Sequence, residues 1–325
     1  MSGVTNGRES RFLLYRLLGE PQRLRLLALA SVEELSVGEL AVLLDEPQPN
    51  VSRHITPLRQ AGLLFDRHQG TRVFVRLADN VRLDPVIADA LIEGERLCEQ
   101  GGSLQRIAQI VAARDKRSRV YFANEEVEEL ELRPVMQVPV YAKALSTVCV
   151  EHRVALDAGT GDGALLDLLA PTFNRVYAVD RSAARLELAK ERAARRTYAN
   201  VTFVCGDVES DAIRSTVDKS VGLVFAARML HHASSPRATL LALWRLLAPG
   251  GQLCVVDYCE HDDELLREQR ADVWMGFSKD QLASLTADTG FSDFEYQVVP
   301  PGFVQSGFDA HIPWFIATAR RPRES

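Results

Sequence analysis

Hydrophobic positions follow two different rhythms along the chain. Up to about residue 148 they recur at helical spacing, as in Val51, Ile55 and Leu58, which share one face of a predicted helix. From residue 153 onwards, short apolar runs alternate with helical segments, and several of these runs end in an acidic residue. The pattern predicts two domains: an α+β N-terminal part that is mainly helical, followed by an α/β domain with a mostly parallel sheet.

The N-terminal part has the order of elements that is typical of a winged helix. Ser36 and Glu39 form a capping box that opens one helix, and Gly62 ends the next helix. A glycine-containing turn at 68–71 then joins two short strands into a hairpin. The expected elements are helices at 12–18, 21–30, 37–45 and 50–61, and strands at 64–67 and 72–77.

Charge is distributed unevenly along the chain. The formal net charge is −6 at pH 7, yet residues 48–78 hold five arginines and a single acidic residue, Asp66. A local basic stripe on an acidic protein indicates a polyanionic partner bound to one face. The alternative interpretation is a helical interaction module with a solvated, charged face.

Three segments of this part resemble the ArsR-type repressors: LGEPQRLRLLALA, LSVGELAVLL and QPNVSRHITPLRQAGLL. The resemblance implies that the second helix of the pair enters the major groove of double-stranded DNA while the wing follows the backbone. It also implies a homodimer, whose interface we expect at residues 11–19 and 84–113. The expected DNA contacts are Gln48, Asn50, Ser52, Arg53 and His54 on the helix, with Arg67 and Arg72 from the wing on phosphates.

Two features depart from that family. Pro57 lies inside the predicted recognition helix, where it removes one backbone hydrogen bond and either kinks the helix or is tolerated at a cost. Metal-sensing members carry paired cysteines on the preceding helix, and residues 36–45 contain no cysteine. Because thiolates are the ligands that hold soft metals, we expect no metal site in this protein.

The segment 154–163, VALDAGTGDG, is the most informative motif of the C-terminal part. An apolar strand ends at Asp157, and Gly159, Gly161 and Gly163 then alternate through a turn into a helical run. Glycines allow a positive φ and a close approach of the backbone to a ligand. A turn of this kind brings backbone N–H groups to a polar ligand. The spacing G-x-G-x-G differs from the dinucleotide fingerprint G-x-G-x-x-G.

Acidic residues at the ends of the next two strands strengthen this interpretation. Asp180 ends the strand 175–180 at about the distance from the glycine turn at which a Rossmann-like unit places a carboxylate on ribose hydroxyls. Asp207 follows the strand 201–207, and Ala248-Pro-Gly-Gly251 precedes the strand 252–258. The alternative is an ordinary doubly wound domain whose glycines and acids coincide by chance.

These landmarks, in this order, resemble the class I S-adenosylmethionine-dependent methyltransferases, and specifically those of the quinone-biosynthesis type. The resemblance implies a Rossmann-like domain with a mostly parallel seven-stranded sheet, and S-adenosyl-L-methionine as the cofactor. In that family the residue at the position of Asp207 hydrogen-bonds the adenine amino group. The expected cofactor-binding residues are Asp157, Gly159, Gly161, Gly163, Asp180, Arg181, Asp207 and Val208.

The sequence says less about the methyl acceptor than about the cofactor. Methyl transfer from a sulfonium is an in-line displacement that depends on proximity and a water-poor pocket. His231 and His232 follow the strand 221–226 and are candidates either for a general base or for the wall of the acceptor pocket. The segment after that strand lacks the motifs of DNA amino-methyltransferases and cytosine C5-methyltransferases. We therefore expect a small-molecule acceptor, with DNA as the site of regulation.

The domain organisation that follows is a winged helix-turn-helix at 1–80, a helical connector at 81–150 and a methyltransferase domain at 151–325. Within the connector we expect helices at 84–98, 104–113 and 136–148, a basic link at 114–119 and an acidic solvated run at Glu125–Glu131. The connector would supply the dimer interface and helices that cover the cofactor.

Composition and cysteine usage agree with this organisation. The 46% hydrophobic and 25% charged residues are typical of a globular protein, and no apolar run approaches the ~20 residues of a membrane helix. We see no signal peptide and no C-x-x-C pair, so we expect a cytoplasmic, reduced protein. Cys205 and Cys254 fall in predicted strands and are expected to be buried in the core.

Three functions remain open at this point. The first is a transcriptional regulator whose second domain methylates a small molecule. The second is a repressor that senses S-adenosylmethionine or S-adenosylhomocysteine without chemistry. The third is a methyltransferase that uses its winged domain only for dimerisation.

Overall fold

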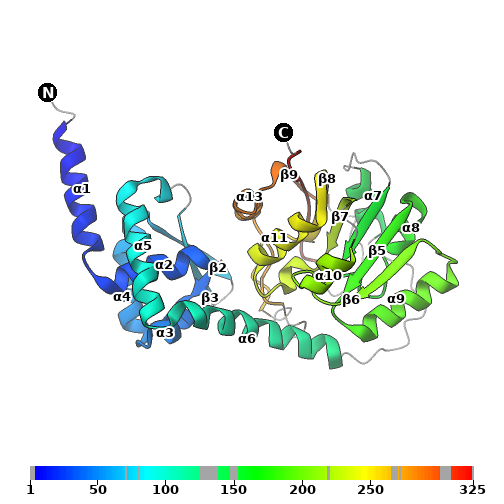
Figure 1. Ribbon diagram of the computed structural model, residues 1–325, viewed down its shortest axis with the longest axis horizontal. Helices are drawn as coiled ribbons and strands as arrows, with labels where there is room; N and C mark the ends of the chain where they lie inside the picture. The colour runs from blue at the N-terminus through cyan, green and yellow to red at the C-terminus, as the bar shows by residue number, and fades with distance from the viewer. Residues whose placement is uncertain are drawn as a thin grey trace. The chain divides into compact units, whose positions relative to one another are not determined.

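The computed structural model describes residues 4–69, 72–78, 81–124, 138–146, 153–217, 220–264, 270, 272–300 and 309–323. The chain divides into two compact units, Met1–Ala113 and Arg114–Ser325, which are described separately below (Figure 1). The expected acidic run Glu125–Glu131 lies outside the described residues. None of the described helices is both long enough and apolar enough to cross a membrane.

The first unit is a winged helix-turn-helix with flanking helices, as the sequence predicts. A three-stranded sheet with the order β1-β3-β2 lies beside the helices, and β2 and β3 form the antiparallel hairpin of the wing. The elements are α1 (Val4–Leu18), α2 (Pro21–Val32), β1 (Leu35–Ser36), α3 (Val37–Leu44), α4 (Gln48–Gln60), β2 (Leu64–Gln69), β3 (Arg72–Leu77), η1 (Val81–Leu83), α5 (Pro85–Gln100) and α6 (Ser103–Asn124).

Local signals set the boundaries of the helix-turn-helix. Ser36 accepts a hydrogen bond from the backbone N–H of Glu39, whose carboxylate accepts one from the N–H of Ser36, so the predicted capping box is confirmed. Asp45 ends α3 in the left-handed conformation, with φ 55°, and starts the turn. The recognition helix α4 continues through Pro57 to Gln60. The proline is therefore tolerated within the helix.

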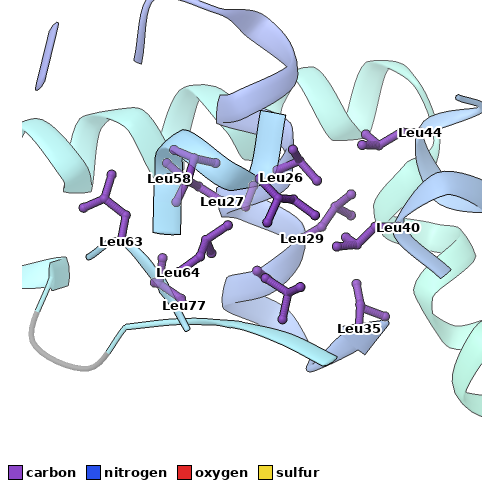
Figure 2. Close-up of a cluster of buried hydrophobic side chains, with 14 of the residues drawn as sticks. Leu26, Leu27, Leu29, Leu35, Leu40, Leu44, Leu58, Leu63, Leu64 and Leu77 are labelled. Atoms are coloured by element: carbon purple, nitrogen blue, oxygen red, sulfur yellow. The ribbon is translucent and has the colours of Figure 1, made fainter. Parts of the chain in front are cut away.

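Leucines from most of these elements meet in one core, which Figure 2 shows in close-up. On α4, Val51, Ile55 and Leu58 are buried, as their spacing predicts. The core also takes in residues of α5 and of the first half of α6, such as Ile87 and Ile107. Helices that we assigned to the connector therefore share the hydrophobic core of the winged helix.

Helix α6 differs from the prediction. We expected a helix to end near residue 113 and a basic link at 114–119, but α6 runs without a break to Asn124. The segment has no glycine or proline, and Asp115 forms an i,i+4 ion pair with Arg119 on the helix surface. Charge alone does not interrupt a helix when opposite charges are spaced by four residues.

The second unit is the expected Rossmann-like domain. Its seven-stranded sheet has the order β6-β5-β4-β7-β8-β10-β9. Neighbouring strands from β6 to β8 are parallel, while β10 is antiparallel to both β8 and β9. The elements are α7 (Val138–Ser146), β4 (Val154–Ala158), α8 (Leu166–Thr172), β5 (Arg175–Asp180), α9 (Ala183–Arg195), β6 (Val201–Cys205), α10 (Asp211–Thr216), β7 (Val221–Ala227), η2 (Leu230–His232), α11 (Pro236–Leu246), β8 (Leu247–Tyr258), α13 (Lys279–Asp288), β9 (Ser292–Val298) and β10 (Trp314–Arg320).

The central strands are buried along their length, because helices cover a parallel sheet on both faces. All five residues of β4 are buried, and Cys254 of β8 belongs to the same core as predicted. The prediction for Cys205 is wrong, because this residue is exposed. Strand β6 is the outer strand of the sheet and Cys205 is its last residue, so packing does not reach it.

The close packing of α2 against α5 gives a test of the first unit. A Cβ on Gly94 would lie 2.2 Å from the carbonyl oxygen of Leu24, so Gly94→Ala must push the two helices apart. We expect a loss of about 1–3 kcal/mol in the free energy of unfolding of this unit, measured as a lowered melting temperature in calorimetry of the full chain. Gly19→Ala is the matched control, because its nearest atom would be 3.5 Å away. Equal transitions for the two variants would contradict the packing.

Candidate functional site: a glycine turn at the carboxyl edge of the sheet

The turn after β4 can be built only from residues that accept a left-handed backbone. Gly159, Gly161 and Gly163 have φ values of 73°, 56° and 78°. A Cβ on Gly159 would approach the Cβ of Met229 to 3.0 Å, and one on Gly163 would approach Ala189 to the same distance. The glycines are therefore required both by the backbone conformation and by the space around two of them.

Asp180 holds this turn in place. One of its carboxylate oxygens accepts a hydrogen bond of 2.8 Å from the N–H of Gly161, and the other accepts one of 2.8 Å from the N–H of Ser182. The side chain is largely buried at the end of β5. The loop after β4 and the start of the helix after β5 are thus fixed relative to each other by one carboxylate.

Asp157 lies beneath the turn at the end of a buried strand. Its carboxylate accepts a hydrogen bond of 2.7 Å from the hydroxyl of Thr160. Burial raises the pKa of Asp157 to about 7, with a smaller contribution from the nearby Asp180 and against the effect of the Thr160 hydrogen bond. The group therefore sits close to its titration point at neutral pH.

Two further predicted cofactor residues contact α6. Arg181 forms an ion pair with Asp115, and Asp207 accepts a hydrogen bond of 2.6 Å from Arg119. Val208 is buried next to Asp207. Sequence reasoning missed both α6 residues, because we expected residues 114–119 to form a link rather than a helix. That the eight predicted residues contact the cofactor stays a prediction.

The candidate catalytic histidines lie in η2, directly after β7. His231 is buried, and its Nδ1 lies 2.6 Å from one carboxylate oxygen of Asp257. The same carboxylate also accepts hydrogen bonds from the backbone N–H groups of Leu230, His231 and Tyr258. Because this carboxylate accepts several hydrogen bonds, we assign the donor role to the Nδ1 of His231, and its Nε2 lies on the opposite side of the ring.

The Nε2 of His231 and the Nδ1 of His232 both face Asp272. They lie 3.7 Å and 3.5 Å from the same carboxylate oxygen, Oδ1. Burial alone would lower the pKa of His231, but the Asp257 and Asp272 carboxylates outweigh it and raise this pKa. Burial lowers the pKa of His232 well below its ordinary value, helped by the nearby His231. The role of the two histidines stays a prediction.

A second polar cluster lies beside these histidines. Arg228 has a positive φ of 54°, and its guanidinium contacts the Asp309 carboxylate at 2.9 Å and the Tyr258 hydroxyl at 2.7 Å. The Tyr258 hydroxyl donates to Asp309 at 2.7 Å. Burial raises the pKa of Tyr258, so this hydroxyl stays protonated. Asp257 gave a usable signal in the sequence as an acid inside an apolar strand, whereas Asp309 gave none.

The predicted DNA-binding residues divide into two groups. On α4, Gln48 and Arg53 are exposed, while Asn50, Ser52 and His54 are partly exposed on the side away from the core. Arg72 of the wing is exposed as well. The assignment of Arg67 to a DNA phosphate is wrong, because this side chain is buried and forms an ion pair of 3.0 Å with Glu34. Phe65 has the same parity along β2 and is exposed, so alternation does not explain the burial of Arg67, which accompanies the ion pair with Glu34.

Comparisons with known proteins agree with both units. The family profile described as a helix-turn-helix domain matches residues 18–64, and the one described as a methyltransferase domain matches residues 156–255. The chain is 40% identical over 88 residues to the arsenical resistance operon repressor of Escherichia coli, which covers 27% of this chain and 73% of the repressor. It is 33% identical over 109 residues to the HTH-type transcriptional regulator KmtR of Mycobacterium tuberculosis, covering 31% of this chain and 83% of that protein.

The second unit has a curated relative of its own. It is 31% identical over 107 residues to the tRNA 5-carboxymethoxyuridine methyltransferase of Escherichia coli. The match covers 33% of this chain and 40% of the enzyme. It therefore spans less than half of that relative and leaves the substrate of this chain open.

The role of Asp180 can be tested directly. Asp180→Ala removes a charged hydrogen-bond acceptor for the cofactor and releases the N–H of Gly161. We expect binding of S-adenosylhomocysteine to weaken by about 1.5–3 kcal/mol, or about 10- to 150-fold, in calorimetry. Asp211→Ala is the control, because that carboxylate is exposed and pairs only with Arg214 among the described ion pairs. If folded Asp180→Ala binds as tightly as the unchanged protein, the assignment of this site is wrong.

Proposed function

This chain belongs to the ArsR-type family of helix-turn-helix regulators and carries an S-adenosylmethionine-dependent methyltransferase domain; from this premise, we propose that it is a transcriptional regulator whose second domain methylates a small molecule. The observation that carries the proposal is the glycine turn held by Asp180, in a chain that also has an exposed recognition helix. A nucleoside cofactor and a DNA operator are the ligands that fit these two features.

DNA binding is proposed to use α4 for bases and the wing for phosphates. Arg53 is exposed on α4, where a guanidinium can reach a base edge, and Arg72 is exposed at the start of β3. Arg67 has no part in this proposal, because its ion pair with Glu34 lies inside the domain.

A homodimer is proposed to present two such helices to neighbouring half-sites. Helix α1 exposes large apolar side chains on its described part, and α5 exposes Ile92. On α1 these are Phe12, Leu13 and Tyr15, each more than half exposed. Apolar surface of this kind on helices that flank a winged helix supports an interface between two copies of the chain.

The arginines give a test of the DNA-binding face. Arg72→Ala should weaken binding to all duplexes alike and lower the slope of log affinity against log salt by about one unit. Arg53→Ala should cost about 1–3 kcal/mol on a fragment from upstream of the gene and relax specificity at one position. Fluorescence anisotropy over a range of salt concentrations measures both effects.

The buried arginine is the matched control for this test. Arg67→Ala should lower the melting temperature, because it removes the buried ion pair with Glu34, but leave the salt slope unchanged. Equal slopes for Arg72→Ala and the unchanged protein would contradict the proposed face.

Helix α6 is proposed to couple cofactor binding to DNA binding. In its first half, Ser103 donates a hydrogen bond to the carbonyl of Leu43, and Arg106 contacts Asp45, at the turn before the recognition helix. In its second half, Arg119 contacts Asp207, the expected acceptor for adenine. A cofactor that binds Asp207 competes with Arg119, and the same helix contacts the helix-turn-helix.

This coupling predicts that cofactor occupancy changes operator affinity. Coupling of about 1–3 kcal/mol would give about a 5- to 150-fold change in anisotropy titrations with saturating S-adenosylmethionine or S-adenosylhomocysteine. Arg119→Ala should reduce this change and, since an exposed ion pair is worth about 0–1 kcal/mol, tighten cofactor binding by up to about fivefold. Arg195→Ala is the control: it removes an exposed ion pair with Glu191 and should leave both the cofactor-dependent change in operator affinity and the cofactor affinity unchanged.

The outcomes of that experiment separate the candidate functions. Identical operator affinity under all conditions would mean that the two domains are only co-localised. A difference between the two cofactor forms, with no methylated product in any assay, would favour the second candidate, a sensor without chemistry. Methyl transfer to RNA, the substrate class that the name of the Escherichia coli relative states, would replace the small-molecule acceptor.

A further inference from the structure

The cluster around η2 has the composition and spacing of a metal site. We propose that the Nε2 of His231, the Nδ1 of His232 and the Oδ1 of Asp272 bind a divalent transition-metal cation, for which Zn²⁺ is the best fit. These three atoms lie within 4.8 Å of one another. The proposal does not depend on methyl transfer or on DNA binding, since its evidence is the arrangement of these side chains alone.

The distances fit an ion better than they fit hydrogen bonds. The Oδ1 of Asp272 lies 3.7 Å from the His231 nitrogen and 3.5 Å from the His232 nitrogen, which is too long for a hydrogen bond. Ligands at about 2.0–2.1 Å from a tetrahedral zinc ion are separated from each other by about 3.4 Å. The three atoms lie within 4.8 Å of one another, so the side chains would have to move closer together to coordinate the ion.

Asp272 supports the same conclusion. Its Oδ1 is buried and, among the described residues, accepts no hydrogen bond. A buried carboxylate oxygen is costly unless it is paired or coordinates a metal. The two histidine rings contact this oxygen only at ion-pair distances of 3.7 Å and 3.5 Å, and a cation between the three groups would give it a close partner.

The orientation of His231 suits coordination. Its Nδ1 lies 2.6 Å from a carboxylate oxygen of Asp257, and its Nε2 is directed at Asp272. A carboxylate that orients a ligating histidine through its other ring nitrogen is the usual arrangement behind zinc ligands. Asp257 is itself fixed by three backbone N–H donors.

The backbone holds the two ligand segments together. The carbonyl oxygen of His231 accepts hydrogen bonds of 3.0 Å from the N–H groups of Val273 and Trp274. The indole N–H of Trp274 donates to the carbonyl of Ala233 at 2.6 Å. Asp272 is therefore held beside η2 although about forty residues separate them in sequence, so the site is largely preformed.

The choice of metal follows from the donor set. Two imidazoles and one carboxylate suit Zn²⁺ and neighbouring transition metals, whereas Mg²⁺ and Ca²⁺ prefer oxygen ligands. The sequence led us to expect no metal site in this protein because thiolate ligands are missing, and the site proposed here uses histidine and aspartate ligands instead. Three protein ligands leave a fourth position for water or for an oxygen or nitrogen of a bound molecule.

Metal binding by the purified full chain tests the proposal. We expect one equivalent of Zn²⁺ in competition with a chromophoric chelator, and a tetrahedral visible spectrum without a thiolate charge-transfer band when Co²⁺ is used. His232→Gln and Asp272→Asn should each weaken Zn²⁺ binding at least tenfold. Asp257→Asn should weaken it by about 10- to 100-fold, because it removes only the orienting carboxylate.

His311→Gln is the matched control. His311 also pairs with a carboxylate, Asp263 at 2.7 Å, but it is exposed and lies outside the cluster, so the variant should bind Zn²⁺ as the unchanged protein does. Circular dichroism and thermal melting identify variants that fail to fold. If the ligand variants do not fold, the Co²⁺ spectrum of the unchanged protein alone tests whether histidine and carboxylate ligands bind the metal. The proposal is overturned if the unchanged protein binds no stoichiometric Zn²⁺, if folded His232→Gln and Asp272→Asn bind it equally well, or if Co²⁺ shows cysteine ligation.

Discussion

Carboxylates buried at the carboxyl edge of a parallel sheet need hydrogen-bond donors, and this requirement organises the whole second unit. Asp180 is satisfied by the N–H groups of Gly161 and Ser182, and Asp257 by three backbone N–H groups and His231. Each carboxylate therefore fixes the loops that follow its own strand and a neighbouring one. The binding turn after β4 and the histidine segment after β7 owe their shapes to these contacts.

The longest described helix is the element that both units share. In its first half, α6 contributes to the core of the winged helix, and in its second half it pairs with acidic and basic residues at the edge of the Rossmann-like sheet. The proposed regulation uses this helix, because one of its surface ions contacts the expected adenine acceptor.

The predictions succeeded where the signal is local. The capping box at Ser36 and the burial of Val51, Ile55 and Leu58 followed from residue spacing and motifs, and the seven-stranded sheet was implied by the resemblance to class I methyltransferases. They failed where the outcome depends on distant residues. Arg67 is buried and forms an ion pair with Glu34. Cys205 is exposed because its strand is the outermost of the sheet. The segment 114–119 is helical, and Asp115 and Arg119 form an ion pair along it.

By itself, the sequence determined the two domains, the elements of the winged helix and the glycine turn, because backbone conformation and hydrophobic periodicity are properties of neighbouring residues. Only the tertiary structure decided which acids meet which partners. Asp272 reaches the two histidines, Asp309 reaches Arg228 and Arg119 reaches Asp207 through folding of segments far apart in the chain. The local sequence around a charged residue does not indicate which distant residue will pair with it. The contacts of the site can therefore be assigned only in the folded chain.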